Sequence, residues 1–109
     1  MDTVRRGFRF SFEATAEIAP EDSPNETVVA RATELSQHGC YIQTPAPFTV
    51  KTLVLVKIFH ANEYFEAKGK VIYVKAASGM GVAFLEIKPY CQSTLKGWIL
   101  SALRGQTSA

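Results

Sequence analysis

Three arginines lie close together near the start of the chain: Arg5, Arg6 and Arg9. Each guanidinium group is a planar fork of N–H donors that can bind a phosphate or a base edge through two hydrogen bonds. The net charge of the 109-residue chain is only +2, which is too small for general attraction to nucleic acids or membranes. A small cationic cluster on a mixed surface suits a compact anion better than a polymer. The alternative is a solvated N-terminal arm, and charge alone does not separate the two.

A second polar group follows the second predicted strand. The segment Glu34-Leu35-Ser36-Gln37-His38-Gly39, here called the acidic turn, places an acidic side chain, a hydroxyl and a glycine close together. Its carboxylate accepts hydrogen bonds, and its hydroxyl donates or accepts them. The acidic turn is therefore a candidate binding element.

Other residue patterns argue against catalysis. The chain has no nucleophile elbow, no phosphate-cradling glycine loop and no paired-histidine metal motif. His38 and Cys40 share a face if they lie on a strand, but two ligands do not make a metal site. His60 and Cys91 would complete a set of four ligands, but nothing in their spacing supports such a metal site. We expect no enzyme activity, no metal and no cofactor.

The elements that position these residues are mainly strands. Near the start of the chain apolar and polar residues alternate, which predicts a strand with one buried face. The apolar residues of this pattern are Phe8, Phe10, Phe12, Ala14, Ala16 and Ile18. Five further segments have strand character, so the predicted strands are 8–18, 27–33, 40–44, 53–60, 64–75 and 80–87. Six strands at short spacing, with no helical period between them, indicate an antiparallel barrel or sandwich.

Two details of these strands can be checked. In the fifth strand Phe65, Ala67, Val71 and Tyr73 are expected on one side, opposite its charged residues. Asn62 is expected to supply the turn before this strand, and Ser78-Gly79 the turn after it.

The end of the chain changes period and predicts an amphipathic helix over residues 92–104. Its apolar stripe has the i, i+3, i+4, i+7 spacing and consists of Leu95, Trp98, Ile99, Ala102 and Leu103. Trp98 is expected to anchor the helix on the barrel, and Gly105 to cap it. We expect one domain, with a flexible basic arm (1–7), a barrel (8–87) and the helix.

The cellular environment follows from what the sequence lacks. No apolar stretch approaches the roughly 18–20 residues of a membrane span, and the start of the chain has no hydrophobic signal region. We therefore expect a cytoplasmic protein without membrane insertion. Cys40 and Cys91 are expected to be free thiols there.

The basic cluster and the acidic turn occur in the order typical of one family. Arg5-Arg6-Gly7-Phe8-Arg9 contains Arg-x-x-x-Arg, the acidic turn contains acidic-x-Ser-x-x-Gly, and Gly79-Met80-Gly81-Val82-Ala83-Phe84 is a glycine-bearing strand. Together they resemble the PilZ domain family across essentially the whole chain. The resemblance implies an all-β fold, a six-stranded antiparallel split barrel with a C-terminal amphipathic α-helix.

The resemblance also implies a ligand, the bacterial second messenger cyclic di-GMP, and a downstream protein partner. Arg5 and Arg9 would bind phosphate and the N7/O6 edge of guanine, with Arg6 as a further candidate. Glu34 would accept from the N–H edge of guanine, and Ser36 would donate or accept. Gly39 would adopt a positive φ that keeps the turn tight against the base.

The sequence departs from the family pattern at position 34, where the family has Asp or Asn. Glutamate adds one methylene, about 1.5 Å, and a misplaced acceptor weakens binding about ten- to a hundredfold. The alternative hypothesis is therefore a PilZ-like protein-interaction module with weak or no nucleotide binding. A third hypothesis, single-stranded nucleic-acid binding, rests on the aromatics near the arginines. It is disfavoured, because those aromatics share the buried parity and the net charge is small, so we expect no DNA partner.

Overall fold

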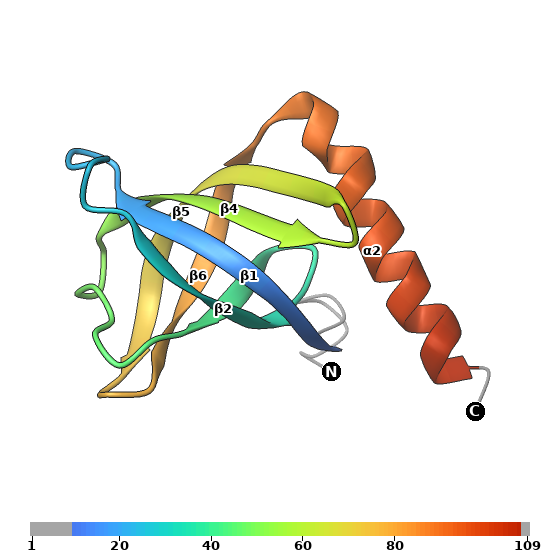
Figure 1. Cartoon of the computed structure of the whole chain (residues 1–109), viewed down its shortest axis with the longest axis horizontal. Helices are drawn as coiled ribbons and strands as arrows, with labels where there is room; N and C mark the ends of the chain where they lie inside the picture. Colours follow the sequence, from blue (N-terminus) through green and yellow to red (C-terminus); the bar gives the residue numbers. More distant parts are fainter. Residues whose placement is uncertain (1–9, 108–109) are drawn as a thin grey trace.

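The computed structural model describes residues 10–107, with the side chains of residues 11–104. Arg5, Arg6 and Arg9 lie outside the described residues. Six antiparallel strands close into a barrel in the order β1-β2-β3-β6-β5-β4, and one helix follows them (Figure 1). The elements are β1 (Phe10–Pro20), β2 (Val28–Leu35), β3 (Gly39–Gln43), β4 (Leu53–His60), β5 (Glu63–Lys75), β6 (Gly79–Ile87) and α2 (Pro89–Thr107). The predicted fold class is confirmed.

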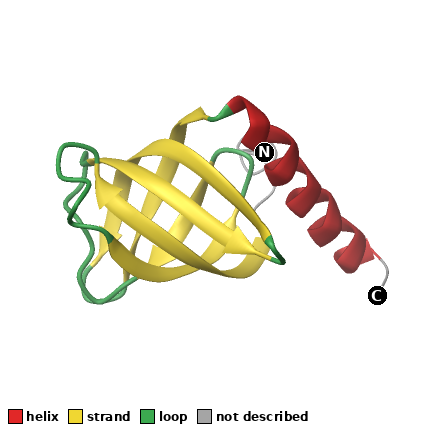
Figure 2. Cartoon of the chain, turned by 45° about the horizontal axis from the view of Figure 1, so that its top comes forward, coloured by secondary structure: helices red, strands yellow, loops and turns green. Residues whose placement is uncertain are grey.

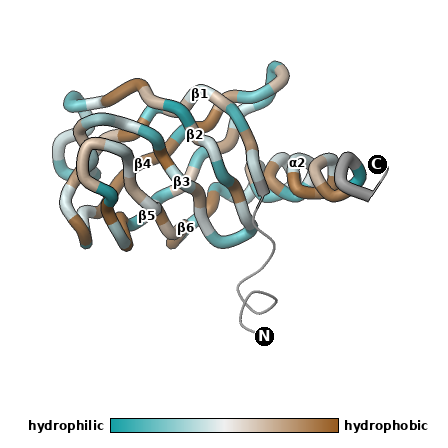
Figure 3. Tube along the Cα trace, turned by 90° about the horizontal axis from the view of Figure 1, so that it is seen from below, coloured by the Kyte–Doolittle hydropathy of each residue, from teal (hydrophilic) through white to brown (hydrophobic). Residues whose placement is uncertain are grey.

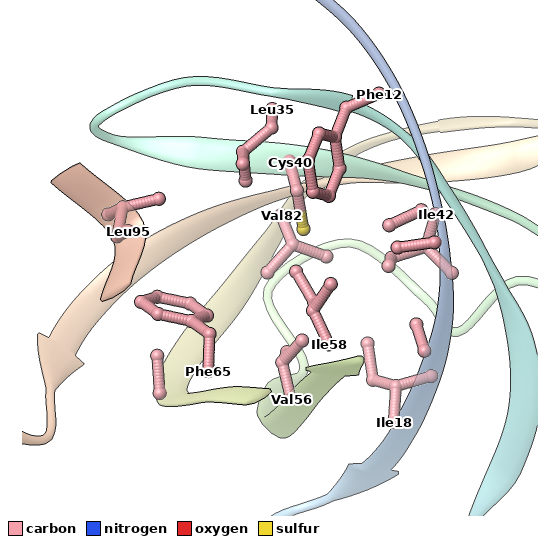
Figure 4. Packing of buried hydrophobic residues seen from close by; sticks show 14 of the residues in the cluster. Phe12, Ile18, Leu35, Cys40, Ile42, Val56, Ile58, Phe65, Val82 and Leu95 are labelled. Atoms are coloured by element: carbon pink, nitrogen blue, oxygen red, sulfur yellow. The ribbon is translucent and has the colours of Figure 1, made fainter. Parts of the chain in front are cut away.

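The alternating pattern of the first strand is confirmed within the described residues. Alternate apolar side chains from Phe12 to Ile18 are buried, whereas Ser11, Glu13 and Thr15, which alternate with them, are exposed. They join inward-facing residues of the other strands in one core, and Leu95 of α2 closes the core near Phe65 (Figure 4).

The fifth strand differs from the expectation at one residue. Its register against β6 shifts so that Val71 pairs with Val82 but Tyr73 pairs with Gly81, which leaves Ile72 as an extra residue. One extra residue reverses the alternation of faces. Val71 is fully buried, but Tyr73 lies on the outer wall. The prediction that Tyr73 faces inward is wrong.

The two turns that flank β5 have left-handed residues. Ala61 and Asn62 have φ values of 51° and 64°, as a two-residue type I′ hairpin requires, and this confirms Asn62 as a turn residue. In the next turn the left-handed residue is Ala77, with φ of 60°. Gly79 is not part of that turn, because it is already paired with Lys75 as the first residue of β6.

The helix α2 is longer than the predicted 92–104. It begins at Pro89, since proline is favoured in a first turn where its missing N–H has no intrahelical partner. It continues to Thr107, so the prediction that Gly105 caps it is wrong; glycine weakens a helix by about 1 kcal/mol but does not by itself end one. The first half packs on one end of the barrel, and the second half extends beyond it (Figure 3).

Candidate functional site

One end of the barrel brings together the elements that the sequence singled out. In an antiparallel barrel the start of β1, the β2–β3 turn, the β4–β5 turn and the exit from β6 lie at the same end. The connections that follow β1, β3 and β5 lie at the opposite end (Figures 1 and 2). The start of α2 lies at the first of these ends, which therefore combines the acidic turn with the helix.

The start of β1 lies directly beside the acidic turn. Phe10 pairs with Leu35, and Ser11 pairs with Glu34. Phe10 is the first described residue and follows Arg9 in the chain. The structure thus joins the chain segment after the arginines to the turn that contains the candidate acceptor.

The Ser36 side chain shapes the acidic turn. Its Oγ accepts hydrogen bonds from the backbone N–H groups of His38 (3.1 Å) and Gly39 (3.2 Å). The backbone N–H of Ser36 donates to the carbonyl of Gly39 at 2.9 Å. Residue Ser36 is 8% exposed, and both lone pairs of its hydroxyl oxygen accept hydrogen bonds within the turn. Ser36 therefore holds the turn in shape around its own side chain.

Gly39 is required for a different reason from the one expected. Its φ is not in the left-handed region, so that prediction is wrong. Instead, a Cβ atom at Gly39 would overlap the carbonyl oxygen of Val82 in β6. The N–H of Phe84 also donates to the carbonyl of His38 at 2.8 Å. Close approach of β6 is therefore what excludes a side chain at position 39.

A bulge turns Glu34 toward the outer wall. Ala32 pairs with Ile42, but Glu34 pairs with Tyr41, so Thr33 is the extra residue. Ala32 and Leu35 are fully buried, and Glu34 is half-buried between them on the other face. Its carboxylate is therefore held on the outside of the barrel beside β1 and β3.

An aromatic cluster links this end of the barrel to the helix. The Phe12 ring lies 4.6 Å from the His60 ring and 5.2 Å from the Trp98 ring, measured between centroids. The Trp98 indole N–H donates to Glu63 Oε1 at 2.9 Å. Trp98 is 5% exposed, which agrees with the anchoring role predicted for it.

The remaining chemistry of the described residues is sparse. Between residues 10 and 107 no three His, Cys, Asp or Glu side chains gather where they could hold a metal. Burial raises the pKa of the Cys40 thiol to about 12, so it stays protonated at neutral pH. A hollow of about 260 Å³ lies on the β1, β4 and β5 wall, lined among others by Glu17, Lys57 and Pro24. Pro24 belongs to the β1–β2 connection, so this hollow lies toward the opposite end from the acidic turn.

Sequence reasoning missed two aromatic residues, one of which is paired with Glu34 of the acidic turn. Tyr41 and Tyr73 lie on the outer wall in the same row of paired residues as Glu34. The signal was present in the alternating glycines Gly79 and Gly81, which leave space above the sheet for rings from neighbouring strands.

Comparison with known proteins gives a consistent result. The family model described as PilZ domain matches residues 3–101. Among solved structures, the inhibitor of motility (MotI/DgrA) of Bacillus subtilis has a TM-score of 0.76 at 15% identity, covering 93% of this chain and 52% of its own. This chain therefore spans about half the length of that protein. The PilZ domain of CeSA from a cellulose-synthesizing bacterium has a TM-score of 0.64 at 17% identity, covering 89% of this chain and 98% of its own.

Curated protein sequences give no match to the chain. Among residues 10–107, no helix has both the length and the apolar composition needed to cross a bilayer.

Proposed function

The chain belongs to the PilZ domain family, and on that premise we propose that it binds cyclic di-GMP and signals through a partner protein. The observation that carries the proposal is the pairing of Phe10 with Leu35 and of Ser11 with Glu34. It places the start of β1, which follows Arg9 in the chain, beside the acidic turn. In this proposal the arginines and the acidic turn contact different groups of the ligand.

The ligand has two phosphates and two guanines, and each group has a complement in the chain. Arg5 and Arg9 bind phosphate and the N7/O6 edge of guanine bidentately, and Arg6 adds positive charge. Glu34, on the outer wall, accepts from the N–H edge of guanine. Ser36 and Gly39 contribute by holding the turn, through the contacts described above.

Calorimetric titration with cyclic di-GMP tests the proposal. We expect heat of binding with the wild-type protein and a large loss of affinity in Arg9→Ala. Lys57→Ala, a charge-matched change on the wall away from the acidic turn, is the control and is expected to bind like wild type. No heat at submillimolar ligand with the wild-type protein would refute the proposal.

A second candidate is a protein-interaction module that needs no nucleotide, and it is favoured by Glu34 at a position where the family has Asp or Asn. A pull-down with and without cyclic di-GMP separates the two functions. Capture of the same partner regardless of nucleotide, and after replacement of the three arginines, supports this second function.

A further inference from the structure

Two tyrosines extend the candidate site across the outer wall. Tyr41 pairs with Glu34 of β2 on one side and with Gly81 of β6 on the other, and Gly81 pairs with Tyr73 of β5. Directly opposed residues on neighbouring strands point to the same face. These four positions therefore form one row across four strands, roughly 14 Å long for three interstrand spacings of about 4.8 Å.

The two rings lie flat on β6 because its glycines leave room for them. A Cβ atom at Gly81 would overlap the Tyr73 ring, and one at Gly79 would lie 2.6 Å from Tyr41 Oη. The ring centroids are 6.2 Å apart, and the ring planes differ by 26°. Both glycines are buried although they face outward. Tyr41 and Tyr73 thus form a nearly continuous aromatic surface, here called the tyrosine platform.

Neighbouring polar groups fix the platform and give it positive charge. The Tyr41 hydroxyl hydrogen-bonds to the Ser78 hydroxyl at 3.2 Å. The Lys75 ammonium lies 5.6 Å from the centroid of the Tyr41 ring. A flat aromatic surface beside an ammonium group suits a ligand that combines a planar base with a phosphate.

We propose that the tyrosine platform stacks against one guanine of cyclic di-GMP while the acidic turn holds the other guanine by its edge. This inference rests on the proposed function. The two ends of the row use different chemistry: Glu34 accepts from the edge of a base, whereas the platform contacts the face of a base. Because the Tyr41 ring extends toward Gly79 and away from the turn, the two base positions do not overlap. A ligand with two linked bases uses both positions, and a mononucleotide uses one.

The platform also covers glycine backbone, which is a structural role that aromatic side chains take in sheets. A second stacked pair provides a matched control for that role. Phe59 and Tyr64 lie across β4 and β5, with centroids 6.3 Å apart and planes 28° apart. They are 38% and 42% exposed and do not belong to the Glu34 row.

The test is calorimetric titration of cyclic di-GMP into wild-type protein and three variants, each with its fold checked by circular dichroism. Tyr41→Leu removes the stacking surface and is expected to raise Kd about 5- to 150-fold. Tyr41→Phe keeps the ring and is expected to stay within about threefold of wild type. Phe59→Leu is expected to bind like wild type.

An unchanged Kd in folded Tyr41→Leu, or an equal loss in Phe59→Leu, overturns the platform while the proposed function stands. Absence of binding by the wild-type protein overturns the proposed function and the platform together. If Tyr41→Leu does not fold, NMR on the wild-type complex decides: contacts between guanine H8 and Tyr41 ring protons support stacking, and their absence overturns it.

Discussion

Replacing Gly39 with alanine tests whether the acidic turn is held against β6 as described. The added carbon would overlap the carbonyl oxygen of Val82 and would lie 3.3 Å from Cα of Ala83. Both are backbone atoms that cannot rotate away, so the strands must separate, at the cost of overpacking, about 1–3 kcal/mol. Separation also weakens the bond from Phe84 N–H to the His38 carbonyl, worth about 0.5–1.5 kcal/mol. We expect the free energy of unfolding to fall by about 2–4 kcal/mol.

Urea unfolding followed by circular dichroism measures this change. With a denaturant slope of about 2 kcal/mol/M, the middle of the range for small proteins in urea, the midpoint should fall by roughly 1–2 M. Gly97→Ala is the matched control, because Gly97 lies in α2 with nothing within 4 Å of an added Cβ. Alanine is favoured over glycine in a helix by about 0.8–1.0 kcal/mol, so this variant should be stabilised. The same substitution thus has opposite signs at the two sites, and a Gly39→Ala midpoint at or above the wild-type value refutes the close approach of β6.

Four further predictions concern Ala61, Trp98, Cys40 and Glu34. Ala61→Gly should raise the free energy of unfolding by about 0.5–1 kcal/mol, since Ala61 has a positive φ of 51° that glycine adopts without strain; an unchanged melting temperature would contradict it. Trp98→Ala should lower the free energy of unfolding, measured by thermal unfolding, by about 3–5 kcal/mol, because the indole packs on the barrel and its N–H donates a hydrogen bond to Glu63. Cys40 should react with a disulfide reagent only as the protein unfolds. Burial raises the pKa of the folded Cys40 thiol from 9.0 to about 12. Because the thiol of the unfolded chain already loses its proton in this range, the free energy of unfolding should fall as pH rises from about 9 toward 12. Glu34→Asp should tighten cyclic di-GMP binding about ten- to a hundredfold by calorimetry, and weaker binding would mean that the longer side chain fits the ligand.

Most of the fold could be predicted from periodicity. Alternation of polar and apolar residues marks β1, whereas β4 is marked by its richness in Val, Leu and Ile and begins and ends at the predicted residues 53 and 60. What periodicity does not predict is the position of a bulge, because one inserted residue leaves the local composition unchanged. The bulge at Ile72 therefore led to the wrong face for Tyr73, and α2 exceeded its predicted length because its ends carry little of the apolar stripe.

The candidate site was predictable to a smaller extent. Glu34, Ser36 and Gly39 could be grouped because they are close in sequence, and Phe10 joins them only through strand pairing. Gly39 was misjudged because the constraint on it comes from Val82, more than forty residues later in the chain, and no local pattern reveals such a contact. Arg5, Arg6 and Arg9 remain predictions, since they lie outside the described residues.

The contact of Trp98 with Phe12 fixes the first half of α2 to the end of the barrel. Phe12 belongs to β1, the strand that begins beside the acidic turn. From Trp98 to Thr107 the helix axis runs about 14 Å, past the edge of the barrel (Figure 3). A tilt of α2 by about 10° at Trp98 would therefore move its last residue by about 2 Å. A change in the packing of Phe12 against Trp98 would thus be larger at the end of the helix than at the rings themselves.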